Sequence, residues 1–220
     1  MTETTRGMVL RTRPLTETSL IVHWLTADHG RLATVAKGAR RSKSPFRGKL
    51  DLFYLADFSF VRSRSSELHN LREVNVIDTN SFLRQDLASL EQASYATGLL
   101  EQTTETETPL PAIYALLVEL LSFLRSHPAQ PEAIATFELK LLDELGLRPD
   151  LESSKMQPGT KRLITGLIES DWPMVGRLKL TAAQQNEIRQ FLHGFLIFHF
   201  GRLPRAPGQT ACQPTARNLT

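Results

Sequence analysis

Residues Ser19–Ala36 read SLIVHWLTADHGRLATVA, which is two runs of β-forming residues on either side of a turn signal, Asp28-His29-Gly30. Similar runs occur before and after this pair. The expected strands are Gly7–Arg13, Ser19–Thr26, Arg31–Ala36, Leu52–Val61 and Leu68–Ile77. Five short strands within residues 1–80 predict an OB-type β-barrel, because closing the sheet removes its exposed edges. An SH3-like barrel would fit this pattern almost as well.

After Asn80 the apolar residues recur with helical spacing, so the predicted fold class is α+β, a five-stranded barrel followed by an all-α region. Gly146 follows one apolar run at the position expected for a helix C-terminus. Thr181 and Gln184 have the spacing of a capping box at the start of the last helix. We expect a barrel domain over 1–80, a helical domain over 81–200 and an irregular tail over 201–220.

Composition limits the class of protein. The chain has 220 residues, of which 41% are hydrophobic, so it can bury a substantial core. It opens MTETTRG, which lacks the basic and apolar segments of a signal peptide, and its longest strongly apolar stretch, Phe191–Phe200, is half a membrane span. We therefore expect a cytoplasmic protein with no membrane partner. The single cysteine, Cys212, allows neither an internal disulfide nor a cysteine zinc site.

One segment, Arg31–Lys49, is strongly basic. Its sequence RLATVAKGARRSKSPFRGK contains no acidic residue and seven cations: Arg31, Lys37, Arg40, Arg41, Lys43, Arg47 and Lys49. Two glycines, two serines and a proline among these charges predict an exposed loop that binds a polyanion, above all nucleic acid. A charged turn kept for solubility is the alternative on charge alone. Phe46, inside the loop, is a candidate for base stacking or, equally, a hydrophobic anchor for the loop.

No catalytic constellation accompanies this loop. The six histidines show no zinc-protease spacing, no serine lies in a nucleophile elbow, and the carboxylate pairs fall in a polar linker or near a helix end. The sequence predicts no enzyme, no metal site and no cofactor. The last helix is apolar almost all the way round, for which we expect full burial, with partial exposure to a partner as the alternative.

Residues Arg11–Leu50 resemble the N-terminal domain of the RecO family of bacterial DNA repair and recombination mediators. The most specific pieces are Glu17-Thr18-Ser19, Gly30-Arg31 and Val35–Arg40 with the basic serine-containing loop that follows. FELKLLDELGL, Phe137–Leu147, is similar to a helix that ends in Leu-Gly in this family. The resemblance covers the chain well to about residue 147 and weakly beyond it.

The resemblance implies a noncatalytic, nucleoid-associated protein that binds single- and double-stranded DNA. It further implies annealing of complementary strands coated with single-stranded-DNA-binding protein and, together with RecR, help in loading RecA. The implied DNA site is Arg31, Lys37, Arg40, Arg41, Lys43, Phe46, Arg47 and Lys49. A generic OB-type module for single-stranded nucleic acid, including RNA, is the alternative function.

This sequence departs from the family at two places. Many members have a four-cysteine zinc module after the Leu-Gly helix, whereas LRPDLESSKMQPGT has no cysteine. The basic motif that usually follows the last helix is replaced by GRLPRAPGQT. For contact with the acidic tail of the DNA-coating protein, the candidates are therefore Phe195, Phe198, Arg202 and Arg205.

Overall fold

A computed structural model describes residues 1–204 and 207 of the chain. The five strands of the N-terminal region form a closed barrel in the order β1-β2-β3-β5-β4. Strands β3 and β5 pair in parallel, and the other neighbours are antiparallel. This topology confirms the predicted OB-type barrel. The strands are β1 (Thr2–Pro14), β2 (Leu20–Thr26), β3 (Gly30–Ala36), β4 (Leu55–Val61) and β5 (Leu68–Asp78).

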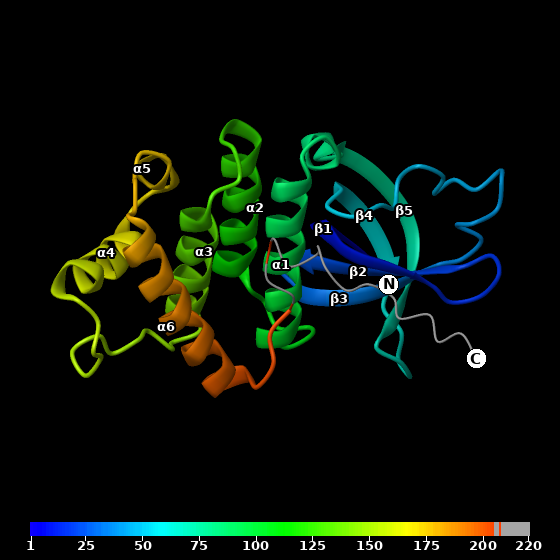
Figure 1. Ribbon diagram of the computed structural model, residues 1–220. Helices are drawn as coiled ribbons and strands as arrows, with labels where there is room; N and C mark the ends of the chain where they lie inside the picture. The colour runs from blue at the N-terminus through cyan, green and yellow to red at the C-terminus, as the bar shows by residue number, and fades with distance from the viewer. Residues whose placement is uncertain (205–206, 208–220) are drawn as a thin grey trace, which may run out of the picture.

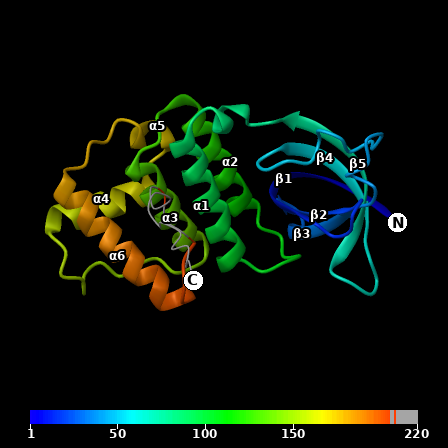
Figure 2. The same ribbon diagram turned by 45° about the vertical axis from the view of Figure 1, so that its right-hand side comes forward.

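The helices follow the barrel and lie on one side of it, with α1 and α2 nearest the strands (Figure 1, and turned in Figure 2). Two of the predicted helix ends are confirmed. Thr181 and Gln184 form a reciprocal capping box, and Gly146 has a φ of 71° with Leu147 N–H donating to the Leu142 carbonyl at 2.8 Å. The helices are η1 (Ser81–Arg84), α1 (Leu87–Thr103), α2 (Pro111–Ser126), α3 (Pro131–Glu144), α4 (Pro158–Glu169), α5 (Trp172–Val175) and α6 (Ala182–Phe200).

Two strand boundaries differ from the expectation by more than one residue. β1 begins at Thr2 rather than Gly7, because its first residues pair with β4, with Thr2 opposite Val61. β4 begins at Leu55 rather than Leu52, because Phe53 has a positive φ of 64° and interrupts the extended chain. Both differences come from contacts or conformations that a local pattern of β-forming residues does not contain.

Aromatic side chains fill the barrel interior. Trp24, Phe58 and Phe60 are at most 1% exposed, and the rings of Trp24 and Phe58 stack with their centroids 4.0 Å apart. The Trp24 indole N–H donates to the Thr34 hydroxyl at 2.9 Å, so the buried donor is satisfied. The barrel core therefore depends on alternating inward residues of β2, β3 and β4.

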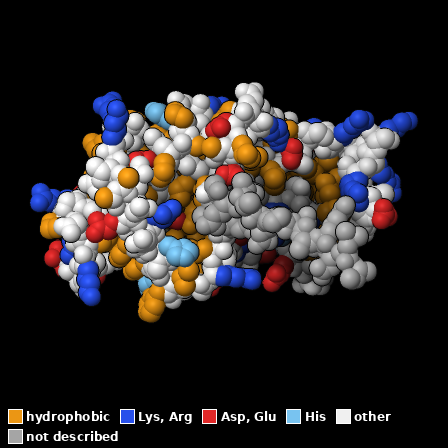
Figure 3. Space-filling view, in the orientation of Figure 1, with side chains coloured by type: hydrophobic (Ala, Val, Ile, Leu, Met, Phe, Trp, Pro, Cys, Tyr) orange, Lys and Arg blue, Asp and Glu red, His pale blue; other side chains and the backbone are white. Residues whose placement is uncertain are grey.

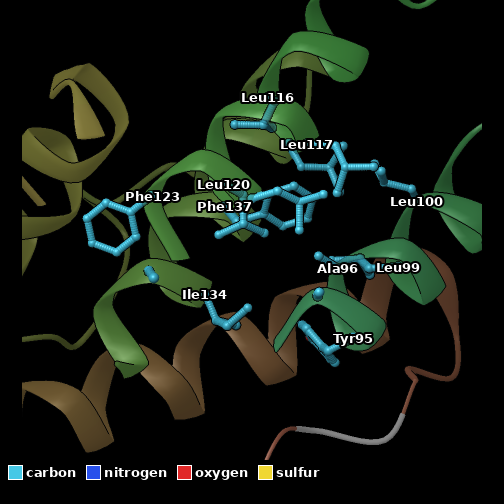
Figure 4. Close-up of a cluster of buried hydrophobic side chains, with 14 of the residues drawn as sticks. Tyr95, Ala96, Leu99, Leu100, Leu116, Leu117, Leu120, Phe123, Ile134 and Phe137 are labelled. Carbon is cyan, nitrogen blue, oxygen red and sulfur yellow. The ribbon is translucent and has the colours of Figure 1, made fainter. Parts of the chain in front are cut away.

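A second core joins the helices to one another. Side chains from α1, α2 and α3 point toward each other, among them Leu99, Leu117 and Phe137, all fully buried (Figure 4). Met8, Leu10 and Leu25 of the barrel belong to the same hydrophobic cluster. The barrel and the helices are consequently packed against each other rather than merely tethered.

The linker from α1 to α2 is hydrogen-bonded to the barrel. Glu107 N–H donates to the Arg31 carbonyl at 2.8 Å, and Leu110 N–H donates to the Ala27 carbonyl at 3.1 Å. We call this contact, between residues 104–110 and the β2–β3 turn with the first two residues of β3, the seam. Gly30 is closely packed there, since a Cβ added to it would lie 1.7 Å from the Thr108 carbonyl oxygen. The seam fixes the helical region on the barrel.

The expectation that the last helix is fully buried is wrong. α6 buries Ile188, Leu192 and Leu196, whereas Phe198 is 84% exposed. Among the described elements the helix packs mainly against α3 and α4, which leaves Phe198 uncovered. In the part of the chain that the structure describes, no helix is long and apolar enough to span a membrane.

Candidate nucleic-acid interface

The basic loop, which we define as Lys37–Lys49, lies between β3 and β4 at the end of the barrel away from the helices (Figure 1). It is a series of tight turns rather than an irregular segment. Backbone N–H groups of Arg41, Ser44, Arg47 and Lys49 each donate to the carbonyl three residues earlier, at 3.0 to 3.2 Å. Gly38 and Gly48 have φ values of 69° and 72°. Glycine supports these left-handed turns without a Cβ penalty, which explains two of the loop's small residues.

Two contacts attach the loop to the barrel. Phe46 is only 7% exposed and packs with barrel-core residues that include Trp24 and Phe58. Arg40 N–H donates to the Thr18 carbonyl at 3.0 Å, and the Arg40 guanidinium donates to the Thr16 carbonyl at 3.1 Å, which joins the loop to the β1–β2 turn. The position of Phe46 favours the anchor over the stacking alternative.

The loop cations face solvent without acidic partners. Lys37, Arg40, Arg41, Lys43 and Arg47 are exposed, and Lys49 is half-buried. Figure 3 shows Lys and Arg side chains gathered over this end of the barrel. Within residues 1–204, none of the six lies within 4 Å of a carboxylate, whereas other arginines do: Arg6 contacts Asp57 at 2.8 Å, Arg62 contacts Glu3 at 3.1 Å and Arg84 of η1 contacts Asp51 at 2.7 Å. The loop therefore presents positive charge that no carboxylate of the described residues neutralises.

Arg31, the first cation of the basic segment, lies elsewhere. It is in β3 at the seam, where its guanidinium donates to the Thr104 hydroxyl at 2.8 Å and also to the Thr104 carbonyl. Burial lowers the pKa of Arg31 from its ordinary value. The structure thus separates Arg31 from the six loop cations with which the sequence groups it.

The β1–β3 face of the barrel forms a different surface from the basic loop. Arg11, Arg13 and His23 line an open groove there together with Arg31 and Glu101. Arg11 contacts Glu101 at 3.3 Å, so part of this positive charge is compensated. Burial, and next the charge of Arg11, lowers the pKa of His23 to about 4, so that this imidazole is neutral at pH 7.

Three of the four residues expected to contact a protein partner can be placed. Phe195 is half-buried, while Phe198 and Arg202 are exposed near the end of α6, where Figure 3 shows hydrophobic and histidine side chains together. Gln102 of α1 donates to the Arg202 carbonyl at 3.0 Å, which positions the segment after the helix. Arg205, the fourth, lies outside the described residues.

A buried acid pair lies between helices α1 and α3, where Tyr95 donates its hydroxyl hydrogen to Glu138. Burial raises the pKa of Glu138 to about 7, and that of Tyr95 rises as well, again chiefly through burial. The sequence did not predict this pair, because neither residue stands in a recognisable motif. No three His, Cys, Asp or Glu side chains of the described residues form a group suited to a metal ion.

Comparison with known proteins matches both regions. Residues 1–80 match the family model described as Recombination protein O N terminal, and residues 84–154 match Recombination protein O C terminal. The chain belongs to the RecO family. The matches cover the barrel with its basic loop and the helices α1 to α3, so the resemblance carried by Arg11–Leu50 and Phe137–Leu147 is confirmed.

RecO relatives from several bacteria align with the same part of the chain. The DNA repair protein RecO of Anaeromyxobacter sp. (strain K) is 36% identical over 148 residues, which are 67% of this chain and 58% of the relative. The proteins of that name from Myxococcus xanthus (strain DK1622) and Bacillus pumilus (strain SAFR-032) are each 32% identical, over 70% and 66% of this chain and 62% and 56% of their own lengths. The chain therefore spans less than two thirds of the RecO proteins it matches.

Proposed function

We propose that this chain is a DNA-binding recombination mediator in DNA repair, and that it works without catalysis. The observation that carries the proposal is the set of six unneutralised cations on an anchored loop of an OB-type barrel in a RecO family chain. Such cations bind phosphates and release the counterions condensed on DNA. The binding is then sensitive to salt and independent of base sequence.

Annealing follows from this kind of binding. Two complementary single strands repel each other through their phosphates, and a protein that neutralises those phosphates allows the strands to approach. Backbone-directed contacts leave the base edges free to pair with the second strand. We accordingly propose that the chain anneals complementary strands coated with single-stranded-DNA-binding protein and, with RecR, helps to load RecA.

Contact with the coating protein is assigned to the end of α6. Phe198 offers a large exposed apolar surface, and the exposed Arg202 lies just beyond the end of the same helix. An acidic peptide with apolar side chains would be held by burial against Phe198 and Phe195 and by charge at Arg202 and Arg205. In a tail-deleted coating protein, this contact should be lost while DNA binding by the basic loop remains.

A strand-annealing assay on coated complementary DNA tests the proposal. We expect annealing by the intact chain and loss of annealing when Arg40, Arg41 and Lys43 are changed to glutamate. Phe198→Ala should slow annealing of coated strands and leave annealing of bare strands unchanged. Binding of RNA as tight as that of DNA, with no annealing of coated strands, would instead support a generic nucleic-acid-binding module.

A further inference from the structure

A groove of about 420 Å³ lies between the basic loop and the outer face of the β4–β5 pair. One wall consists of Pro45, Phe46 and Lys49 from the loop. The floor and opposite wall come from the strands, with Thr4 of β1 at one side. Their lining residues are Asp57, Phe58, Ser59, Arg72, Glu73, Val74 and Asn75. The groove is therefore continuous with the surface proposed to hold phosphates.

A β-bulge determines which side chains reach this groove. The β4–β5 register shifts between Ser59 and Phe60, so that Ser59 pairs with Glu73 while Phe60 pairs with Leu71. Arg72 is the extra residue, and it points outward together with Glu73, whereas Leu71 and Val74 on either side are buried. Bulges redirect side chains in this way and are frequent beside binding sites. Here the bulge adds a cation to the rim of the groove.

The groove has the chemical composition expected of a nucleotide site. Pro45 is exposed and supplies apolar wall, whereas Phe46, Phe58 and Val74 line the groove from the barrel core and are at most 7% exposed. Ser59, Glu73 and Asn75 supply hydrogen-bond donors and acceptors. Lys49 and Arg72 supply positive charge. Of the side chains lining the groove, all of which the structure describes, Asp57 alone has an ion-pair partner, Arg6 at 2.8 Å. A nucleobase presents apolar faces, a polar edge and neighbouring phosphates, which these three sets of groups match.

We propose that the groove receives one unpaired nucleobase of a single strand whose phosphates lie along the basic loop. This inference rests on the proposed function of the loop. A base within a duplex is stacked and paired, and extracting it costs a few kcal/mol, so the groove accepts single strands and not duplexes. The loop then supplies affinity for any DNA, and the groove supplies preference for the unpaired strand.

The test compares three DNA probes of equal length: oligo-dT, an abasic single strand with the same phosphates, and a duplex. Ser59→Leu fills the groove without changing charge, and Ser65→Leu is its matched control, because Ser65 is exposed in the β4–β5 turn and does not line the groove. Asn75→Leu is a second groove-filling variant. Thermal melting of all three variants establishes that they fold.

We expect wild type to bind oligo-dT about tenfold more tightly than the abasic strand, a typical contribution of one well-held base. Ser59→Leu and Asn75→Leu should remove this preference and leave binding of the abasic strand and the duplex within about twofold. Ser65→Leu should change nothing. The inference is overturned if the groove-filling variants keep the preference, or if they weaken all three probes equally.

Failure of the loop assignment gives a different result. If glutamates at Arg40, Arg41 and Lys43 leave the binding of all three probes unchanged, the proposed function fails at its first step. If that variant loses all binding while Ser59→Leu has no effect, the loop assignment stands and the groove assignment alone is wrong.

Discussion

The arginines and lysines at the two ends of the barrel are held in opposite ways. At the seam, Arg31 donates to Thr104, and Arg62 contacts Glu3 at 3.1 Å and also Glu107. At the basic loop, the cations have no acidic partner among the described residues. The same residue types therefore fix the helices to the barrel at one end and remain available to a ligand at the other. Partner residues, rather than the number of positive charges, distinguish the structural site from the site that we propose for binding.

The largest effect on stability is expected when the seam is disrupted. In Gly30→Ala, the added Cβ meets the Thr108 carbonyl oxygen at 1.7 Å, and the residue keeps a φ of 63°. We expect a loss of about 3 to 5 kcal/mol in the free energy of unfolding, measured by urea denaturation. Gly48→Ala in the basic loop is the control, because it has a φ of 72° but open space around it, and should cost about 1 to 2 kcal/mol. Equal losses in the two variants would contradict the close packing of the seam.

The second prediction concerns Phe46, the side chain that anchors the basic loop. Phe46→Ala should lower the free energy of unfolding by about 3 kcal/mol, because Phe46 is buried in the barrel core. Phe46→Leu should cost less than about 1.5 kcal/mol and leave single-strand affinity within about twofold, since an apolar side chain of similar size remains. If Phe46→Leu keeps its stability but binds single strands about tenfold more weakly, the ring contacts bases and the anchor interpretation is wrong.

A third arrangement is Glu138, a buried carboxyl group with no ion-pair partner among the described residues. The pKa of Glu138 is raised to about 7 in the folded protein, so folding favours its protonated form. This stabilisation is fully present below the unfolded pKa near 4.5 and is lost as pH rises through about 7. Glu138→Gln should therefore be more stable than wild type at pH 8, by up to about 3 kcal/mol, and nearly equal to it at pH 4. Unfolding curves at both pH values measure the difference, and an equal difference at the two would contradict burial as the cause.

Local signals predicted much of the fold. The five strands, the Thr181 capping box and the Gly146 helix end each depend on neighbouring residues, so the sequence pattern sufficed. Features that depend on distant partners were missed. The start of β1 at Thr2 requires β4, and the exposure of Phe198 depends on how few elements cover α6.

In the candidate site, too, features that depend on neighbouring residues were predicted and features that depend on distant residues were not. The six loop cations were predicted because their charge and flanking glycines are contiguous in the sequence. Arg31 was grouped with them, since nothing near it in the sequence reveals Thr104 as its partner. The groove was missed altogether, because it is assembled from the loop, β1, β4 and a bulge in β5.

The most direct test of the central claim is the salt dependence of single-strand binding, compared between wild type and the Arg40→Glu, Arg41→Glu, Lys43→Glu variant. The substitutions are in an exposed loop without ion pairs, and Arg40→Glu also removes the hydrogen bond to the Thr16 carbonyl, so they should lower the free energy of unfolding by about 1 kcal/mol and leave the variant folded. For wild type, with four to six cations on phosphates, we expect the logarithm of affinity to fall with the logarithm of salt concentration at a slope of about −3 to −4. The variant should bind far more weakly, with a slope close to zero. An unchanged affinity and slope in the folded variant would contradict the assignment of the basic loop as the DNA-binding site.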